Sequence, residues 1–274
     1  MTKSVKTVEA IRARDISVLI TRPKAGAERL AQKLSALGVT PIVAPMVEIK
    51  PRRDARLPAI EVANSGIDVL IFVSNSAASC GIPALPESVF ATAKIFAVGA
   101  STAKAIRSVM SNTWPKFGAM EVLVPAGDYN SEALLELDAL RAEAIANKQV
   151  LIVRGIGGRE LLASELSNRG AKVAYFEVYE RVKTTDLLRL TLRHHQIECP
   201  SIGVVTSVEG LSILAEKISA EKLTTLFDMQ ILAAGARIAG KVPNYGFTKP
   251  PMIADNPTPE SIAACLERRI MEKL

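Results

Sequence analysis

The sequence has few of the side chains that enzymes most often use for acid–base, nucleophilic or metal chemistry. It contains two adjacent histidines, His194 and His195, and three cysteines without CxxC spacing. A Ser-His-Asp relay or a metal site needs imidazoles spread around a pocket, so we interpret the histidines as solvent-exposed helix residues and expect no metal. The odd number of cysteines is typical of reduced thiols in a cytosol. Any chemistry must therefore proceed without histidine.

Long apolar and long basic segments are also absent from the sequence. No apolar run approaches the ~18 residues of a membrane span, and residues 1–15 carry charges where a signal peptide needs an apolar core. Aromatic residues make up only 4%, and no run of Lys and Arg exceeds a pair, which disfavours a nucleic-acid partner. We expect a soluble, cytoplasmic protein with no membrane partner. The net charge of +6 is compatible with an acidic small molecule as the ligand.

Four segments of the chain recur in the same order, which predicts an internal repeat. Each is a short apolar run followed by a loop and by a helical pattern of apolar residues three and four positions apart. Residues 40–44 and 172–178 add a fifth strand to each copy. The matched segments are SVLITR at 17–22 with QVLIVR at 149–154, DVLIFVS at 68–74 with SIGVVTS at 201–207, KIFAVG at 94–99 with QILAAG at 230–235, and the strand–loop–helix segments that begin at 122 and 251.

Strands and helices that alternate at this spacing predict an α/β protein with parallel sheets and helices on both faces. The repeat by itself suggests two doubly wound domains with a boundary near Asn147. Ligands of such domains bind beyond the carboxyl ends of the strands, so the loops that begin there are the candidate site. Two domains that face each other would enclose a cleft. The loops begin at Arg22, Ser74, Gly99, Pro125, Arg154, Ser207 and Gly235.

A glycine-rich segment, Arg154 to Glu160, follows one of these strands and precedes a helix. Its glycines, Gly155 and Gly157 among them, leave backbone N–H groups free to approach an anion, and Arg154 and Arg159 add positive charge. A dinucleotide fingerprint would place its third glycine where Glu160 stands, and no GxxxxGK[ST] motif occurs, so a nucleotide is disfavoured. A tight turn with a solvent-exposed arginine is the alternative interpretation.

Hydroxyl and amide side chains follow other strands, where helices are expected to begin. Helix N-caps favour Ser, Thr and Asn, so capping is one interpretation and binding of a carboxylate is another; both can hold at once. Tyr179, in the segment VYER, lies at the expected end of its strand. Its phenol would either pack half-buried or donate a proton to a leaving group. The hydroxyl and amide residues are Ser74, Asn75, Ser101, Thr102 and Ser207.

Eight segments, in order from about Ser17 to Leu266, carry a resemblance to a known family. They are VLITRPKAG, PIVAPMVEI, DVLIFVSNSAA, FAVGASTAKAI, VLIVRGIGGRELLASEL, VYER, VVTSVEGL and ADNPTPESI. In this order and spacing the chain resembles the uroporphyrinogen-III synthase family. The resemblance implies two flavodoxin-like domains joined by a two-stranded linker. The first domain would combine residues 1–45 with 181–274, and the second would be 46–180. This division and the one with a boundary near Asn147 differ in which sheet contains the first strand.

The resemblance also implies an activity. Members of the family are lyases that convert linear hydroxymethylbilane into cyclic uroporphyrinogen III, with inversion of ring D and without a cofactor. Loss of the hydroxymethyl oxygen gives an azafulvene, the substituted carbon of ring D attacks it, and the spiro intermediate fragments and closes the other way round. The reaction needs a proton donor and a firmly held substrate. We expect a cytoplasmic monomer that takes this tetrapyrrole, with a transient hand-over from hydroxymethylbilane synthase.

Roles for individual residues follow from the resemblance position by position. Tyr179 matches the tyrosine that assists departure of the hydroxyl group, and Thr102 matches a functionally important threonine. Ser74 and Ser207 match strand-end serines that face the cleft. Three glycines match those that keep their loops open, namely Gly99, Gly155 and Gly235. The other substrate-binding candidates are Arg22, Asn75, Ser101, Arg154, Gly157 and Arg237.

The sequence departs from the family pattern at Ile238, where a threonine is usual. This exchange removes a hydroxyl group, and a cation, Arg237, stands one residue earlier. We hypothesise that Arg237 or backbone N–H groups hold a substrate carboxylate there instead.

Two further hypotheses come from other classes of protein. The first is a non-catalytic two-domain protein that binds an acidic small molecule in its cleft; the lack of a secretion signal and the presence of Tyr179 count against it. The second is an oxidoreductase with a dinucleotide cofactor, which Glu160 disfavours.

Overall fold

Two compact units make up the part of the chain that the computed structural model describes, residues 16–52, 54, 66–126, 130–158 and 160–271. Unit 1 is Met1–Glu48 with Val182–Leu274, and unit 2 is Ile49–Arg181. Residues 1–15, whose charges disfavour a signal peptide, lie outside the described ranges. Among the described helices, none combines the length and apolar character that crossing a bilayer requires.

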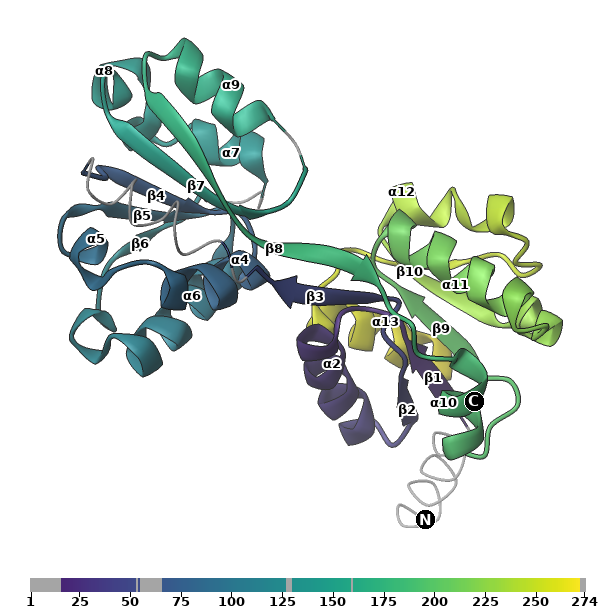
Figure 1. Ribbon diagram of the computed structural model, residues 1–274. Helices are drawn as coiled ribbons and strands as arrows, with labels where there is room; N and C mark the ends of the chain where they lie inside the picture. Colours follow the sequence, from purple (N-terminus) through teal and green to yellow (C-terminus); the bar gives the residue numbers. More distant parts are fainter. Residues whose placement is uncertain (1–15, 53, 55–65, 127–129, 159, 272–274) are drawn as a thin grey trace, which may run out of the picture. The chain divides into compact units, whose positions relative to one another are not determined.

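Unit 1 is built on a parallel sheet with the strand order β11-β10-β9-β1-β2 (Figure 1). Its strands are β1 Ser17–Ile20, β2 Thr40–Val43, β9 Ile202–Val205, β10 Gln230–Ala234 and β11 Met252–Ala254. Its helices are α2 Lys24–Ala36, α10 Leu188–His194, α11 Val208–Ala220, α12 Ala236–Ala239 and α13 Pro259–Met271. Because β1 pairs with β9, Val18 opposite Ile202, the boundary near Asn147 is wrong. A repeat shows which segments are similar, but it does not show which segments pair.

Unit 2 is built on a second sheet, with the strand order β3-β8-β7-β4-β5-β6. The strands from β8 to β6 are parallel to one another. Its strands are β3 Val47–Pro51, β4 Val69–Phe72, β5 Lys94–Ala97, β6 Val122–Leu123, β7 Gln149–Gly155 and β8 Lys172–Lys183. Its helices are α4 Asn75–Gly81, α5 Glu87–Thr92, α6 Ala100–Thr113, α7 Ser131–Leu135, α8 Ala142–Ile145 and α9 Leu161–Asn168.

The chain passes between the units along β3 and the later part of β8. The N–H of Thr184 donates to the carbonyl of Met46 at 3.1 Å, and the N–H of Arg52 donates to that of Val178 at 2.9 Å, so the two segments run antiparallel. The expected two-stranded linker is thereby confirmed. The sequence predicted a strand that ends at 178, which is too short. The strand continues to Lys183 because its last residues pair with this second crossing of the chain rather than with β7.

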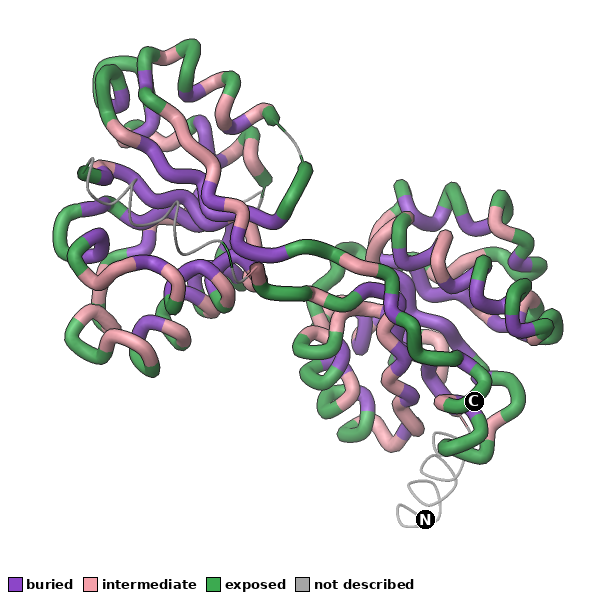
Figure 2. Tube along the Cα trace, viewed as in Figure 1, coloured by how far each residue is buried: buried purple, intermediate pink, exposed green. Residues whose placement is uncertain are grey.

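Helices bury both faces of the unit 2 sheet, which explains its uninterrupted apolar strands. Leu70 and Phe72 of β4 pack against α4, α5 and α6. The alternating residues Val69 and Ile71 pack against α7, α8 and α9 on the opposite face. Figure 2 shows the same pattern along the chain, with buried residues following the strands and exposed residues on the outer sides of the helices.

The segments matched by the repeat take equivalent places in the two sheets. The orders β11-β10-β9-β1-β2 and β6-β5-β4-β7-β8 place each strand where its matched segment lies in the other unit. Each sheet therefore contains strands from both halves of the sequence. The internal repeat itself stays a prediction, because generic strand–helix units could also show this similarity by chance.

Candidate active site at the carboxyl ends of the strands

The carboxyl ends of the unit 2 strands bring several predicted site residues together. Ser74 follows β4, Gly99 follows β5, and Gly155 ends β7, so all three lie at one edge of the parallel sheet. Tyr179 of β8 reaches the same edge. Its Oη lies 3.1 Å from Ser74 Oγ. A Cβ built on Gly155 would stand only 2.6 Å from two carbons of the Tyr179 ring, so glycine is what leaves room for the phenol.

A β-bulge directs Tyr179 to this edge. Arg154 lies opposite Glu177, but Gly155 lies opposite Tyr179, so Val178 is an extra residue on β8. Side chains alternate along a strand, and a bulge shifts this alternation by one residue. Tyr179 therefore packs on the face that contacts α4 and α6, and it is only 6% exposed. It lies inside β8, not at its end as the sequence suggested, because β8 continues into the linker.

Ser74 and Ser207 cap equivalent helices in the two units. Ser74 Oγ accepts the N–H of Ala77 at 3.0 Å at the start of α4. Ser207 Oγ accepts the N–H of Gly210 at 3.0 Å at the start of α11. The capping interpretation is confirmed for both residues. Ser74 Oγ also contacts Tyr179 Oη, so capping leaves the hydroxyl able to make a second hydrogen bond.

The start of α6 adds further predicted residues to the unit 2 edge. Ser101 Oγ donates to Asn75 Oδ1 at 3.4 Å, which links the first turns of α6 and α4. Thr102, the third residue of α6, is buried with 4% exposure. Gly99 precedes the helix in an extended conformation with φ −177°, which any residue can adopt, so its glycine has no conformational explanation. Gly157 differs, because its φ of 73° strongly favours glycine.

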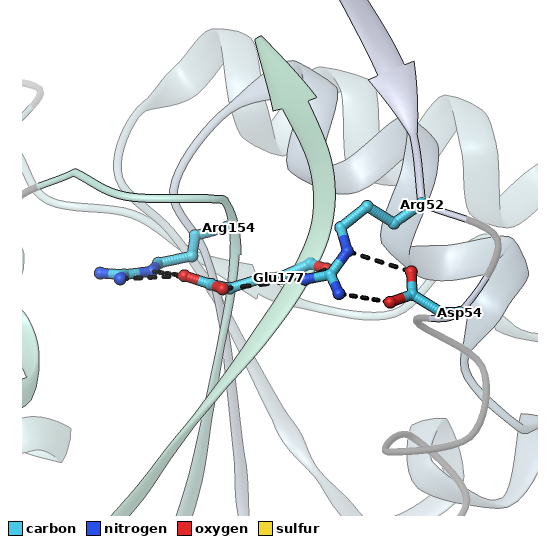
Figure 3. Close-up of polar contacts among 4 residues, drawn as sticks. All are labelled: Arg52, Asp54, Arg154 and Glu177. Atoms are coloured by element: carbon cyan, nitrogen blue, oxygen red, sulfur yellow. Dashed lines mark hydrogen bonds and ion pairs between the residues drawn. The ribbon is translucent and has the colours of Figure 1, made fainter.

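Arg154 is not a free cation but the centre of an ion-pair cluster. Its Nε and Nη2 donate to Glu177 Oε1 at 3.2 and 3.1 Å, and its Nη1 donates to Glu160 Oε1 at 3.0 Å. The guanidinium carbon lies 3.6 Å from the centre of the Tyr175 ring. Glu177 also faces Arg52, whose Nη1 is 3.8 Å from Oε2, and Arg52 in turn pairs with Asp54 (Figure 3). The alternative interpretation, a solvent-exposed arginine, is therefore wrong for Arg154, and Arg159 lies outside the described residues.

The cluster shifts the pKa values of its members. Burial alone lowers the pKa of Arg154, but the hydrogen bonds to Glu160 and Glu177 outweigh it and raise the pKa. The hydrogen bond from Tyr175 and then that from Arg154 lower the pKa of Glu160. Burial and then the hydrogen bond to Glu160 raise the pKa of Tyr175 to about 12. At neutral pH the cluster therefore holds a charged arginine, a charged Glu160 and a neutral phenol.

In unit 1 the predicted residues occupy the corresponding strand ends. Arg22 follows β1, and its Nη1 donates to the carbonyl of Pro257 at 3.1 Å. Burial, and then repulsion from Arg29, lower the pKa of Arg22. Gly235 follows β10 with a φ of 108°, a conformation that side chains other than glycine rarely adopt.

Ile238 and Arg237 point to different environments. Ile238 is 4% exposed and packs in the hydrophobic core of unit 1, whereas Arg237 is exposed on α12. The isoleucine therefore fills the core, and the neighbouring cation is accessible to solvent. His194 and His195 end α10 in exposed positions, which confirms their interpretation as solvent-exposed helix residues.

Sequence reasoning missed the partners of Arg154. Glu177 and Tyr175 lie two residues apart on β8, so they share one side of the strand and meet the same guanidinium. This spacing in the segment YFEVYE was the available signal. No sequence signal pointed to Arg52, because its contact with Glu177 arises only where the end of β3 lies beside β8. Within the described residues, no group of three or more His, Cys, Asp or Glu side chains could hold a metal ion.

The two doubly wound sheets, the two-stranded linker and the polar strand ends define a flavodoxin-like two-domain α/β protein. The family model described as uroporphyrinogen-III synthase HemD matches residues 28–266. The chain belongs to the uroporphyrinogen-III synthase family.

Curated relatives agree with this assignment. Uroporphyrinogen-III synthase of Salmonella typhimurium is 34% identical over 204 residues, which are 73% of this chain and 78% of that protein. The enzyme of Proteus mirabilis is 34% identical over 174 residues, which are 61% of this chain and 81% of that protein. The enzyme of Escherichia coli is 32% identical over 61% of this chain, and the match spans just under two thirds of that protein, 65%.

Solved structures of enzymes with the same name share the fold. Uroporphyrinogen-III synthetase from Helicobacter pylori superposes with a TM-score of 0.56 at 15% identity, covering 94% of this chain and 99% of that one. A mutant of the Thermus thermophilus enzyme gives a TM-score of 0.55 at 19% identity, covering 94% and 100%. These likenesses support the two-unit α/β architecture.

Proposed function

We propose that this chain converts hydroxymethylbilane into uroporphyrinogen III by dehydration and cyclisation with inversion of ring D. The observation that carries the proposal is the buried Tyr179 at the strand-end edge of unit 2, with its hydroxyl on Ser74, in a chain of this family. Hydroxide is a poor leaving group, so the first step needs a proton donor held at a fixed place. A phenol fixed in this way supplies one without histidine.

In the proposed reaction Tyr179 gives its proton to the hydroxymethyl oxygen of the substrate. The C–O bond then breaks and water leaves. The resulting cation, whose charge is delocalised onto the neighbouring pyrrole nitrogen, is the protonated azafulvene. The substituted carbon of ring D attacks the former hydroxymethyl carbon and forms the spiro intermediate. This intermediate then fragments and closes the other way round, which inverts ring D. The last step releases a ring proton, so Tyr179 is regenerated and the net change is the loss of one water molecule.

We propose that polar groups at the unit 2 strand ends hold the substrate carboxylates. Asn75, Ser101 and Thr102 lie in the first turns of α4 and α6, where backbone N–H groups lack helical acceptors. Gly157 is exposed and keeps the neighbouring backbone accessible, whereas Gly99 and Gly155 are buried at the same edge. Thr102 is buried beside these residues, and we assign it a catalytic rather than a purely binding role.

Arg154 reaches a substrate carboxylate only by exchanging one of its own partners. Glu160 is the partner to exchange, because its side chain is 61% exposed whereas that of Glu177 is 29% exposed. Such an exchange would keep the guanidinium paired at every stage, as a buried charge requires.

In unit 1 we propose that Arg22, Ser207, Gly235 and Arg237 hold further carboxylates. Arg237 is the exposed cation beside the position where the family has a threonine. Arg237→Ala should raise KM for hydroxymethylbilane several-fold. Unchanged KM and turnover would remove Arg237 from the site and leave the backbone N–H groups of this loop.

The proposed activity has a direct test. The protein is given hydroxymethylbilane, the products are oxidised, and the uroporphyrin isomers are separated. We expect isomer III to predominate, whereas heat-inactivated protein should yield the isomer of spontaneous closure. An isomer ratio equal to that of spontaneous closure would reject the activity, and tight tetrapyrrole binding without turnover would favour a non-catalytic binding protein.

We further propose that the chain works as a cytoplasmic monomer and receives its substrate from hydroxymethylbilane synthase. The three cysteines, all among the described residues, form no disulfide, which suits a reducing compartment. Cell fractionation and light scattering test the location and the mass. If hydroxymethylbilane passes directly between the two enzymes, the fraction of isomer III among the products should stay constant when both enzymes are diluted together. A falling fraction would show that hydroxymethylbilane is released into solution.

A further inference from the structure

The hydroxyl of Ser74 lies between two hydrogen-bonding groups with different needs. Its Oγ accepts the N–H of Ala77 at 3.0 Å and lies 3.1 Å from Tyr179 Oη. A serine hydroxyl has one proton to donate and two lone pairs. One lone pair is used by Ala77, and the proton can be directed at Tyr179. The capping residue of α4 is thus also a donor for the phenol.

The direction of this second hydrogen bond is fixed once Tyr179 has lost its proton. A phenolate can only accept hydrogen bonds, so the Ser74 proton must then point to Tyr179 Oη. Ser74 meets this demand by rotation of its hydroxyl alone, because Ala77 continues to occupy its other side. A hydrogen bond from a neutral donor to a charged oxygen is roughly twice as strong as a neutral one.

The residues packed around Tyr179 fix where its phenol oxygen lies. Gly155 contacts the ring so closely that a Cβ would overlap it, and the bulge at Val178 sets the face on which the ring lies. Ala77 and Ala78 bury the first turn of α4 in the same core, which holds Ser74 in place. The ring and the serine therefore belong to one packed assembly rather than to two mobile side chains.

We propose that Ser74 is a positioning residue for the reaction: it holds Tyr179 Oη toward the substrate and donates to the phenolate that forms when the hydroxymethyl oxygen departs. The inference rests on the proposed function and adds to it a group that acts through Tyr179. It accounts for two contacts by one side chain, since capping of α4 needs only the lone pair and the phenolate needs only the proton.

Two substitutions separate the hydroxyl from the helix cap. Ser74→Ala removes both, whereas Ser74→Gly removes the hydroxyl at little cost to the cap, because glycine is a good N-cap residue. Glu221→Gln is the control for a weakened helix start: its Oε1 and Oε2 accept the N–H groups of Leu188 and Arg189 at 2.9 and 2.7 Å at the start of α10 in unit 1. We expect both Ser74 variants to lose kcat about 10- to 100-fold with little change in KM. Glu221→Gln should lower the Tm and keep kcat.

A double-mutant cycle with Tyr179→Phe decides whether Ser74 acts through Tyr179. In that background, Ser74→Gly should change kcat by less than about 2-fold. An equal loss of kcat in both backgrounds would overturn the proposal and make Ser74 act on the substrate itself. A rise in KM at constant kcat, or a loss of kcat that follows the Tm rather than the hydroxyl, would overturn it too.

The outcomes also separate this inference from the proposed function. If the wild-type chain makes no isomer III, the proposed function fails. If it makes isomer III but the cycle shows no coupling between Ser74 and Tyr179, only the positioning role fails. Ser74→Thr keeps a hydroxyl and should retain most of the wild-type kcat. A Ser74→Thr variant that folds but is inactive would contradict the proposed hydrogen bond from residue 74 to Tyr179.

Discussion

At the scale of single residues, Tyr179 is the group on which the proposed chemistry depends most directly. Tyr179→Phe removes the hydroxyl and keeps the ring against Gly155, so the packing of unit 2 should survive. We expect kcat to fall about 100- to 1000-fold while the affinity for uroporphyrinogen III changes little. The isomer assay and a product titration measure the two quantities. Equal losses in both would make Tyr179 a positioning residue.

Tyr175 should set the stability of the chain in alkaline solution. Its pKa is raised from 10.0 to about 12, first by burial and then by the hydrogen bond to Glu160. The fold favours the neutral phenol, so this contribution is complete below pH 10 and is lost as the pH rises toward 12. Tyr175→Phe should flatten that part of the decline, as followed by urea midpoints. Tyr245→Phe, in unit 1, is the control, and parallel curves for wild type and Tyr175→Phe would contradict the prediction.

The sequence identifies the residues at the strand ends but not whether they are available. The rule for parallel sheets predicts the correct edge for Ser74 and Arg154, whereas Tyr179 reaches that edge through the bulge in β8. Arg154 was expected to bind substrate, yet its main partner, Glu177, lies 23 residues further along the chain on a neighbouring strand. Side-chain pairing across strands depends on register, which a single sequence does not specify.

At the scale of elements, Arg154 joins β7, β8 and the loop that leads to α9. Arg154→Ala leaves the half-buried Glu177 without its closest cation, so we expect a loss of about 2 kcal/mol in the free energy of unfolding. Glu160→Gln is the control, since its more exposed pair should contribute less than about 1 kcal/mol. Urea unfolding gives these values. A raised KM without a loss of stability would instead show that Arg154 serves the substrate alone.

The elements themselves were largely predictable, because buried parallel strands and amphipathic helices have distinct periodicities. The bulge at Val178 was not predictable. One extra residue in the segment EVYE leaves both Val178 and Tyr179 buried, and an apolar pair of this kind does not reveal which of the two pairs with β7.

At the scale of the whole molecule, we propose that the two units are separate domains, so the inserted one should fold alone. A fragment of residues 49–181 contains every strand of its sheet from β4 to β8 except the last residues of β8. We expect it to unfold cooperatively on heating. Fragments 1–147 and 148–274, cut at Asn147, should not, because that cut separates β1 from β9 and β4 from β7. Cooperative unfolding of either half would contradict the division.

The topology was accessible only in part from the sequence. The repeat supplied the strands and their equivalence, but similarity between halves fits either a simple tandem or an exchanged arrangement. Pairing of β1 with β9 distinguishes them, and this contact joins residues that are distant in the chain. The resemblance to the family predicted that the chain crosses into the second unit and returns, which the repeat alone does not specify.

The insertion of unit 2 also determines the order in which the chain can fold while it is being made. β1 leaves the ribosome about 180 residues before β9, the strand that pairs with it in the sheet of unit 1. At about 5 to 20 residues per second this is a delay of roughly 10 to 40 s. Every strand of unit 2 is translated within that interval. β1 is therefore synthesised before every strand of unit 2 but can pair with β9 only after all of them, so its apolar residues must be kept from aggregating during that interval.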